Sequence, residues 1–320
     1  MKKFILIPII LGSILLTVGG VVLAVAISKG VTNAQTPLIE NKHELEEEFT
    51  NFDVDLKTSD LEFKVASDDK KVVVCKETEK EYHTVKVENN TLIIKQIDEK
   101  KWYENIMNFH FESMKVTIYL PKGEYQTLKA VGHTGSINIP SDFSFIDVDA
   151  KLSTGSMLLE SNVTNAINAN VSTGSIRINN VTTKNIVANS STGSIILSNI
   201  NAEEKVYAKA STGSVTLDNV RVKDVETYAS TGRIYLKNTI ASNHIEVKTS
   251  TGDVKLEDVD ADSLNIKTDT GDVKGTLLTG KTFDVDSDTG KRKVPDSTIG
   301  AGLCKIRTDT GDIIITVKNA

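Results

Sequence analysis

A Thr-Gly pair that recurs at nearly constant spacing constrains the fold more than any other feature of this sequence. Successive glycines of these pairs lie 19 to 21 residues apart from residue 135 to residue 311. Ten occurrences in one phase require a structure that advances by the same step in every period. We therefore expect residues 131–320 to form regular structural repeats, each with one corner glycine. The corner glycines are Gly135, Gly155, Gly174, Gly193, Gly213, Gly232, Gly252, Gly271, Gly290 and Gly311.

Within each period, apolar and polar residues alternate, as in 175–178 and 186–190. Alternation with period two predicts strands, so each period holds two short strands joined by two bends. Stacking the periods aligns one apolar side chain per turn into a column. The sequence thus predicts an all-β fold, a single-stack parallel β-solenoid with about 19–21 residues per turn. The clearest column is Ile176, Ile195, Val215, Ile234, Val254 and Val273.

The glycine suits a sharp corner, because such a bend commonly needs a positive φ that residues with a β-carbon disfavour. From residue 190 to residue 287, the position three residues before it holds small side chains, such as Ser190, Ala210 and Ala229, so the solenoid should be thin there. Cys75 precedes the regular repeats, and Cys304 falls in the last period. The stacked turns would hold these cysteines too far apart for a disulfide, and we expect two free, buried thiols.

The N-terminal thirty residues predict export. Lys2 and Lys3 precede an uncharged run over residues 4–27, whose 24 residues are long enough to cross a bilayer as a helix. Residues 1–30 therefore read as a single-pass membrane anchor that leaves the C-terminal part outside the cytoplasm. The alternative is a cleaved signal peptide, for which Ala24 and Ala26 form a small-x-small site. Either interpretation exports the rest of the chain.

Two segments separate the anchor from the regular repeats. Residues 31–49 are assigned as a linker. Residues 50–130 are rich in predicted strands but irregular, so they are expected to cap the solenoid, since an uncovered terminal turn would offer free backbone groups to other chains. Residues 56–63 resemble a degenerate repeat. The solenoid could thus begin near residue 52 and carry a hairpin insertion.

Charge and context argue against two classes of ligand. The first thirty residues contain three lysines and no acidic residue, so the exported part holds 37 − 3 = 34 basic and 43 acidic groups. This balance argues against nucleic acid as a partner. Residues 275–282 match the P-loop string, but a P-loop needs a helix after its lysine, where this repeat predicts a strand. We therefore expect no nucleotide.

Aspartates crowd the corner in the last turns, and three of them belong to an Asp-Thr-Gly string like that of aspartic proteases. Serine occupies the same position in earlier repeats, so aspartate and serine are interchangeable at this corner position. No catalytic residue is therefore assigned. The carboxylates are either solvated or bridged by a cation such as Ca²⁺; an unfolding midpoint that is the same with Ca²⁺ and with chelator would exclude the cation. No other cofactor is expected. The candidate cation ligands are Asp253, Asp269, Asp272, Asp288, Asp309 and Asp312.

An aromatic segment at residues 101–111 stands out in a chain with only 5% aromatic residues. It reads either as a plug on the first turn or as a contact with a membrane or protein partner. Its candidate contact residues are Trp102, Tyr103, Phe109 and Phe111.

The serial Ser-Thr-Gly-Ser and Asp-Thr-Gly-Asp turns, with the Leu-Pro-x-Gly step at residues 120–123, resemble the bacterial DUF4097 family of adhesin-like β-strand repeat proteins over roughly residues 50–320. The resemblance implies a cell-envelope protein and no catalytic residue. The sequence departs from the family pattern at residues 291–295, where a strand would be expected. We expect the turn that contains these residues to loop out. We interpret the chain as a non-enzymatic extracytoplasmic protein that binds an unknown protein or an envelope or host polymer. The alternatives are an accessory protein of an envelope-stress response and a carbohydrate-active β-helix enzyme.

Overall fold

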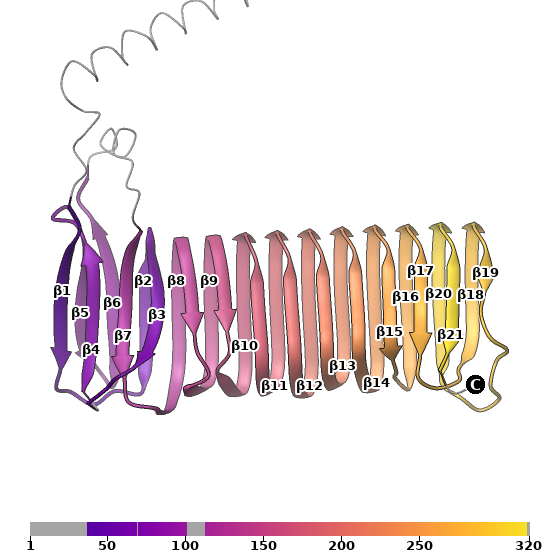
Figure 1. The fold of residues 1–320 in the computed structure, drawn as a ribbon, viewed down its shortest axis with the longest axis horizontal. Coiled ribbons are helices and arrows are strands. Elements are labelled where there is room, and N and C mark those ends of the chain that lie inside the picture. The colour runs from indigo at the N-terminus through magenta and orange to yellow at the C-terminus, as the bar shows by residue number, and fades with distance from the viewer. Residues whose placement is uncertain (1–36, 69, 101–112, 319–320) are drawn as a thin grey trace, which may run out of the picture.

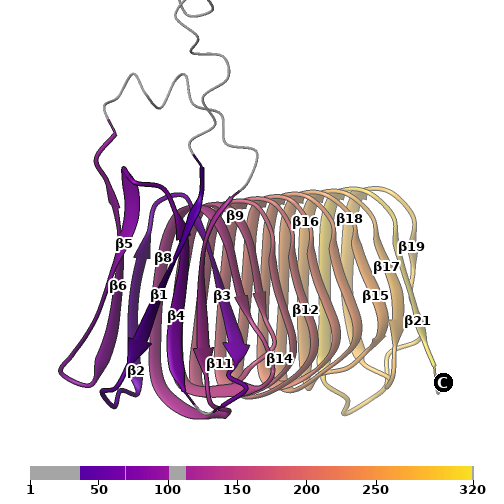
Figure 2. The same cartoon turned by 60° about the vertical axis from the view of Figure 1, so that its left-hand side comes forward.

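The computed structural model describes residues 37–68, 70–100 and 113–318. Every regular element in these ranges is a β-strand, and the strands join into one sheet of 21 strands (Figures 1 and 2). The sheet coils into an elongated β-solenoid, which we call the rack. No helix in these ranges is long and apolar enough to cross a bilayer. The predicted membrane span, residues 4–27, and the aromatic segment at 101–111 lie outside the described residues.

The central turns are long parallel strands stacked in register, which confirms the predicted β-solenoid. The predicted column is present, because Ile195 pairs with Ile176 on one side and with Val215 on the other. These strands are β8 (Gly123–Ile139), β9 (Phe143–Leu159), β10 (Asn162–Thr173), β11 (Ile176–Thr192), β12 (Ile195–Thr212), β13 (Val215–Thr231) and β14 (Ile234–Thr251). In β11–β14 two predicted short strands join through the second bend, and in β8 and β9 they join through the glycine corner.

The second bend is made by an asparagine in the left-handed region, a residue that tolerates this conformation because its short polar side chain bonds locally. Asn180, Asn199 and Asn219 have φ of 56°, 53° and 56°, and Asn238 and Asp258 occupy the same position in later turns. The side-chain amide of Asn199 donates to Asn180 over 2.9 Å, and that of Asn219 donates to Asn199 over 2.8 Å. An asparagine ladder therefore runs along this edge.

The core is a thin layer of aliphatic side chains enclosed by each turn. At the narrow end, three residues before the corner glycine, the small side chains lie in one column as predicted. Where this side chain is a hydroxyl, it donates to the corner carbonyl of the neighbouring turn: Ser190 to Gly174 over 3.2 Å and Thr268 to Gly252 over 3.1 Å. Small residues thus serve both the tight packing and the hydrogen bonding of the corner.

The C-terminal end departs from the expected order of turns. The strands are β15 (Val254–Val259), β16 (Ser263–Thr270), β17 (Val273–Leu277), β18 (Thr282–Thr289), β19 (Arg292–Lys293), β20 (Leu303–Thr310) and β21 (Ile313–Val317). β20 lies between β16 and β18, and β21 lies between β17 and β19. The turn of β20 and β21, which is the last in sequence, therefore lies in the stack between the turn of β16 and β17 and the turn of β18 and β19, as Figure 1 shows. The expectation of one identical step per period is wrong for this turn.

The charge of residues 291–293 explains the insertion. Arg292 pairs with Ile313, whose column faces the core in every other turn, so a strictly sequential stack would bury a guanidinium group among aliphatic side chains. At the end of the rack Arg292 is exposed and forms an ion pair with Asp286 at 2.8 Å. The expectation that residues 291–295 loop out holds only in part. β18 and β19 stay stacked as the terminal turn, with β19 shortened to two residues, and residues 294–302 form no strand.

The N-terminal end begins with a turn built from β2 (Asn51–Leu56) and β3 (Ser59–Val65), which stacks on β8. On one side, β3 is extended by β7 (Met114–Leu120), β4 (Lys71–Glu77) and β1 (Ile39–Leu45); on the other, β2 is extended by β6 (Thr91–Asp98) and β5 (Glu81–Glu88). We call β1 and β4–β7 the cap. Beneath it lies a cluster of edge-to-face and tilted rings: Phe49, Phe52, Phe63, Tyr125, Phe143 and Phe145.

Candidate functional site

A groove runs along the outside of the glycine corner of the regular turns. It consists of two adjoining hollows, of about 550 Å³ and 310 Å³, that share Lys209. Alternation of inward and outward side chains creates it, because two outward columns flank one inward column, which includes Leu152 and Val171 in the first turns and small residues from Ser190 on. One wall is the serine column: Ser153, Ser172, Ser191, Ser211, Ser230 and Ser250. The other wall holds Lys151, Asn170, Asn189, Lys209, Tyr228 and Lys248.

The second wall carries amide, ammonium and aromatic groups. The side-chain amide of Asn189 donates to Asn170 over 3.0 Å. Lys248 is paired with Glu246 at 2.5 Å, and the Tyr228 hydroxyl donates to the same carboxylate. Within the described part of the chain, no ion pair holds the ammonium group of Lys209. The groove therefore offers hydroxyl and amide partners along its length and an available cation near its middle.

Sequence reasoning treated the serine column only as evidence against a protease and did not identify the groove. The signal that could have found it is the small column, which predicts a narrow strip between two outward polar columns.

The ten corner glycines lie at the tips of the turns with φ between 136° and 154°.

The six aspartates fall into two columns at this corner. Asp253, Asp272 and Asp312 form one, in which each carboxylate accepts an N–H of the next turn: Asp253 from Asp272 over 3.1 Å, and Asp272 from Asp312 over 2.7 Å. The register of β16, β20 and β18 stacks Asp269, Asp309 and Asp288 in the other column. The first column thus supports the backbone between turns. The cation edge stays a prediction.

The P-loop string lies on strands and a connection instead of a loop followed by a helix. Residues 275–277 belong to β17, and Thr282 begins β18. The ammonium group of Lys281 is largely buried, forms an ion pair with Asp260 at 2.7 Å and donates to Thr279. This lysine therefore supports the connection between β17 and β18.

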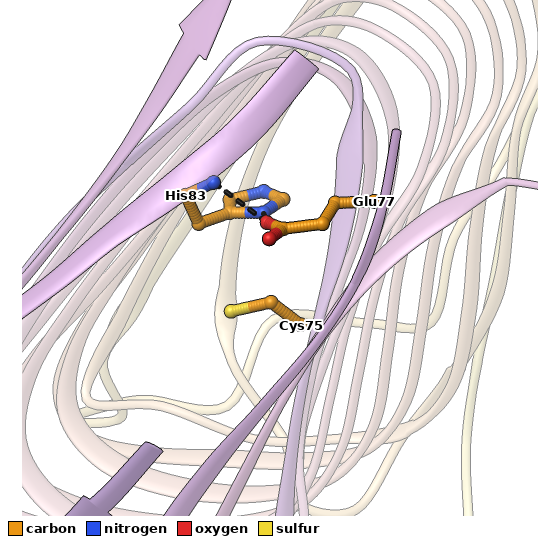
Figure 3. A group of neighbouring side chains, drawn as sticks. All are labelled: Cys75, Glu77 and His83. Carbon is orange, nitrogen blue, oxygen red and sulfur yellow. Dashed lines mark hydrogen bonds and ion pairs between the residues drawn. The ribbon is translucent and has the colours of Figure 1, made fainter. Parts of the chain in front are cut away.

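A second candidate site lies in the cap, where Cys75, Glu77 and His83 bring their side chains together (Figure 3). Cys75 and Glu77 share one face of β4, two residues apart, and His83 faces them from β5. One ligand atom from each lies within 4.8 Å of those of the other two. Sequence reasoning missed this cluster, because no repeat pattern links the three positions and only the pairing of separate strands brings them together.

Hydrogen bonds fix two of these three side chains. Glu77 accepts from the backbone N–H of His83 over 2.7 Å and lies 2.7 Å from ring nitrogen Nδ1. The other ring nitrogen, Nε2, lies 2.9 Å from the hydroxyl of Ser59. Burial lowers the pKa of His83, outweighing the opposite effect of the Glu77 carboxylate, and burial raises the pKa of the Cys75 thiol to about 12. The imidazole and the thiol are therefore neutral near pH 7.

The bonds from Ser59 through His83 to Glu77 follow the order of a serine–histidine–acid triad. Ser59, however, is only 3% exposed. It occupies the corner position that glycine takes in later turns, beneath the cap. A substrate carbonyl does not reach its hydroxyl in this structure.

A neighbouring polar network covers the same first corner. The side-chain oxygen of Gln96 accepts the backbone N–H groups of Lys57 and Thr58 over 2.7 and 2.9 Å. Glu81 accepts from the Thr58 hydroxyl over 2.9 Å and forms an ion pair with Lys100. The cap thus provides the corner of the first turn with side-chain partners in place of a preceding turn.

The two cysteines are free and buried, as predicted. Cys304 lies on β20 with its pKa also raised to about 12 by burial. It is a second buried thiol, far along the rack from the cap.

The comparisons with known proteins agree with this fold. The model of the family described as Toastrack DUF4097 matches residues 49–239 and 201–320. A "putative adhesin" from Parabacteroides merdae is 14% identical with a TM-score of 0.50, covering 76% of this chain and 97% of its own. Another from Bacteroides fragilis is 17% identical with a TM-score of 0.43, covering 89% of this chain and 100% of its own. No curated protein matches. Because the family model spans most of the sequence, this chain belongs to the Toastrack DUF4097 family.

Proposed function

We propose that this protein is a non-enzymatic interaction protein of the cell envelope that binds an extended envelope or host polymer along the groove at its glycine corner. The observation that carries the proposal is the groove itself. Its serine wall repeats a hydroxyl group at each turn, at the strand spacing of about 4.8 Å, and the opposite wall presents one amide, ammonium or aromatic group per turn. A site that repeats at a constant step suits a ligand that is itself periodic.

The groups in the groove favour a polysaccharide over a peptide or a lipid. Serine hydroxyls and asparagine amides both donate and accept hydrogen bonds, as sugar hydroxyls require. Tyr228 adds an aromatic surface, with the ammonium group of Lys248 5.6 Å from its ring centroid. Lys209 adds a positive charge, whereas Lys151 is paired with Asp149 at 3.0 Å. We infer that the polymer carries anionic groups.

A binding role without catalysis is supported by the position of the triad-like arrangement of Ser59, His83 and Glu77. Its serine is buried beneath the cap, on a different part of the molecule from the groove. The similar solved structure from Parabacteroides merdae carries the description "putative adhesin". Both points favour an interaction protein over the carbohydrate-active enzyme.

Lys209 provides a test of the groove. Lys209→Glu reverses charge at the point that both hollows share, and Lys184→Glu makes the same change to net charge at an exposed lysine outside the groove. We expect Lys209→Glu to weaken binding to isolated cell walls in a sedimentation assay on the order of fivefold, equivalent to about 1 kcal/mol. Lys184→Glu should bind like the parent.

Equal binding by the parent and both variants would place the ligand elsewhere. Equal weakening by both would mean that binding depends on net charge alone. If cell walls are not bound at all, in-cell crosslinking from position 209 separates the remaining functions: capture of a membrane signalling protein favours the stress-response accessory, and capture of a host glycan favours adhesion.

We also propose that residues 4–27 anchor the protein in the cell membrane as a single span, with the rack outside the cytoplasm. The uncharged length of this segment and the two lysines before it support the proposal. Protease added to intact cells should degrade the rack while the membrane retains a fragment containing residues 4–27. Recovery of the mature chain starting near residue 27 in the medium would favour the cleaved signal peptide instead.

A further inference from the structure

The cluster of Cys75, Glu77 and His83 has a composition that the fold alone does not require. The inward positions next to Cys75 are aliphatic, with Val73 beside it and Val116 opposite it, and a stack of this kind gains stability from apolar side chains there. Here a thiol, a carboxylate and an imidazole are buried together, with exposures of 0%, 2% and 4%. Burial of such groups is costly unless they are paired or bound to a metal.

The three donor types match one class of ligand. Thiolate sulfur, imidazole nitrogen and carboxylate oxygen are the protein ligands of Zn²⁺. One atom of each type lies within 4.8 Å of the other two, so a small contraction would bring all three to one ion. A hard cation such as Ca²⁺ prefers oxygen ligands alone. The sulfur of Cys75 therefore points to a transition metal.

The surrounding contacts resemble the outer sphere of a metal site. The Ser59 hydroxyl lies 2.9 Å from Nε2 of His83, where its oxygen can accept a hydrogen bond from the N–H of that nitrogen and leave Nδ1 to face Glu77 and Cys75 with its lone pair. The side-chain amide of Asn41 donates to Oε1 of Glu77, which orients the carboxylate. Both contacts hold the ligands without occupying the sulfur.

An unpartnered nitrogen on β1 supplies an independent observation. Nε2 of His43 is buried and has no hydrogen-bond partner. His43 pairs with Val73, and Asn41, two residues earlier, pairs with Cys75. Residues directly opposite each other in an antiparallel pair face the same side of the sheet. His43 therefore faces the side that carries Cys75 and Glu77, one row from Cys75 and two rows from Glu77. Its ring lies outside the 4.8 Å group and would have to turn toward it to become a ligand.

We propose that Cys75, Glu77 and His83 form a Zn²⁺-binding site within the cap, with His43 as the fourth ligand. An ion at this site would link β4 to β5 and, through His43, would also link the edge strand β1 to them. It would stabilise the cover over the first turn of the rack. This site is independent of the proposed polymer groove, so either can fail without the other.

The free cysteine in the rack offers a matched control. Cys75 and Cys304 are both completely buried, but only Cys75 belongs to the cluster. Full-length protein, treated with chelator and then loaded with Co²⁺ as a spectroscopic substitute for Zn²⁺, should show sulfur-to-cobalt charge-transfer absorption at one Co²⁺ per chain. Cys75→Ser should abolish this absorption and Cys304→Ser should retain it. Zn²⁺ should compete the absorption away and raise the unfolding temperature of the parent.

The unmodified parent keeps the test decisive if a variant fails to fold. Absence of charge-transfer absorption in chelator-treated parent whose circular dichroism remains that of a folded β-protein would overturn the site. So would absorption that persists in Cys75→Ser or disappears in Cys304→Ser. For the fourth ligand, His43→Ala should weaken Co²⁺ binding at least tenfold while keeping the absorption, and an unchanged affinity would remove His43 from the ligand set.

Discussion

The corner glycines meet two separate requirements at the scale of single residues. Their φ of 136° to 154° lies where side chains with a β-carbon are strained. Neighbouring corners also approach closely, so that a β-carbon placed on Gly213 would lie 2.1 Å from the carbonyl oxygen of Gly193. Only the first requirement was argued from the sequence. The second follows from the stacking of identical corners, where each glycine leaves room for the next.

Substitution at one corner should therefore destabilise the rack. Gly213→Ala introduces both the strained φ and the contact with a backbone carbonyl, which belongs to a neighbouring turn and cannot move independently. We expect it to lower the free energy of unfolding by more than about 2 kcal/mol, measured by denaturant titration. Gly123→Ala is the control, since that glycine has nothing within 4 Å of its β-carbon position. Similar midpoints for the two variants would contradict this account of the corner.

The sequence predicted the positions of the glycine corners, but it did not predict which residue makes the second bend or how the cap strands pair. Gly marks a corner almost uniquely here, whereas Asn occurs at many positions, so the sequence did not distinguish Asn180, which has a left-handed φ, from Asn179 beside it. In the cap, the spacing of Cys75 and Glu77 places them on one face of a strand. Whether His83 meets them depends on how β5 is placed over β4, and no periodicity encodes that placement.

At the scale of elements, the order of the last turns is decided by which strand can tolerate the end of the stack. β20 and β21 supply Ile306, Ile313 and Ile315 to the core. The turn of β18 and β19 instead carries Arg292 at a core-facing position. Exchanging the two turns buries the isoleucines on both sides and leaves the guanidinium group in solvent. The periodic glycines predicted the number of turns but contained no information about this exchange.

Disulfide trapping should distinguish the two orders of turns. In the observed order Asp269 is next to Asp309, at the inter-strand spacing of about 4.8 Å, which lies within the Cα range for a disulfide. Asp288 lies two turns from Asp269, at roughly 10 Å. With Cys75 and Cys304 replaced by serine, the pair Asp269→Cys with Asp309→Cys should crosslink under mild oxidation, as measured by mass spectrometry. The pair Asp269→Cys with Asp288→Cys should not, and the reverse result would indicate sequential stacking.

At the scale of the whole molecule, the two ends of the rack are protected in different ways. The N-terminal end has antiparallel strands on both sides and a cluster of aromatic rings beneath them. At the C-terminal end, within the residues that the structure describes, β18 pairs only with β20, and β19 only with β21. In a stacked repeat each turn is stabilised mainly by its immediate neighbours, so the turn with one neighbour should open most easily.

Amide hydrogen exchange should therefore decrease in rate from the C-terminal end inward. We expect the fastest exchange among the paired amides in β18 and β19, slower exchange in β20 and β21 despite their later position in the chain, and the slowest in β11–β13, which have neighbours on both sides. Mass spectrometry of peptic fragments from the native protein can resolve these segments. Faster exchange in β20 than in β18 would show that the C-terminal residues form the exposed end, and it would contradict the inserted turn. Comparable rates at both ends of the rack would show that the cap protects the first turns no better than the open edge protects the last ones.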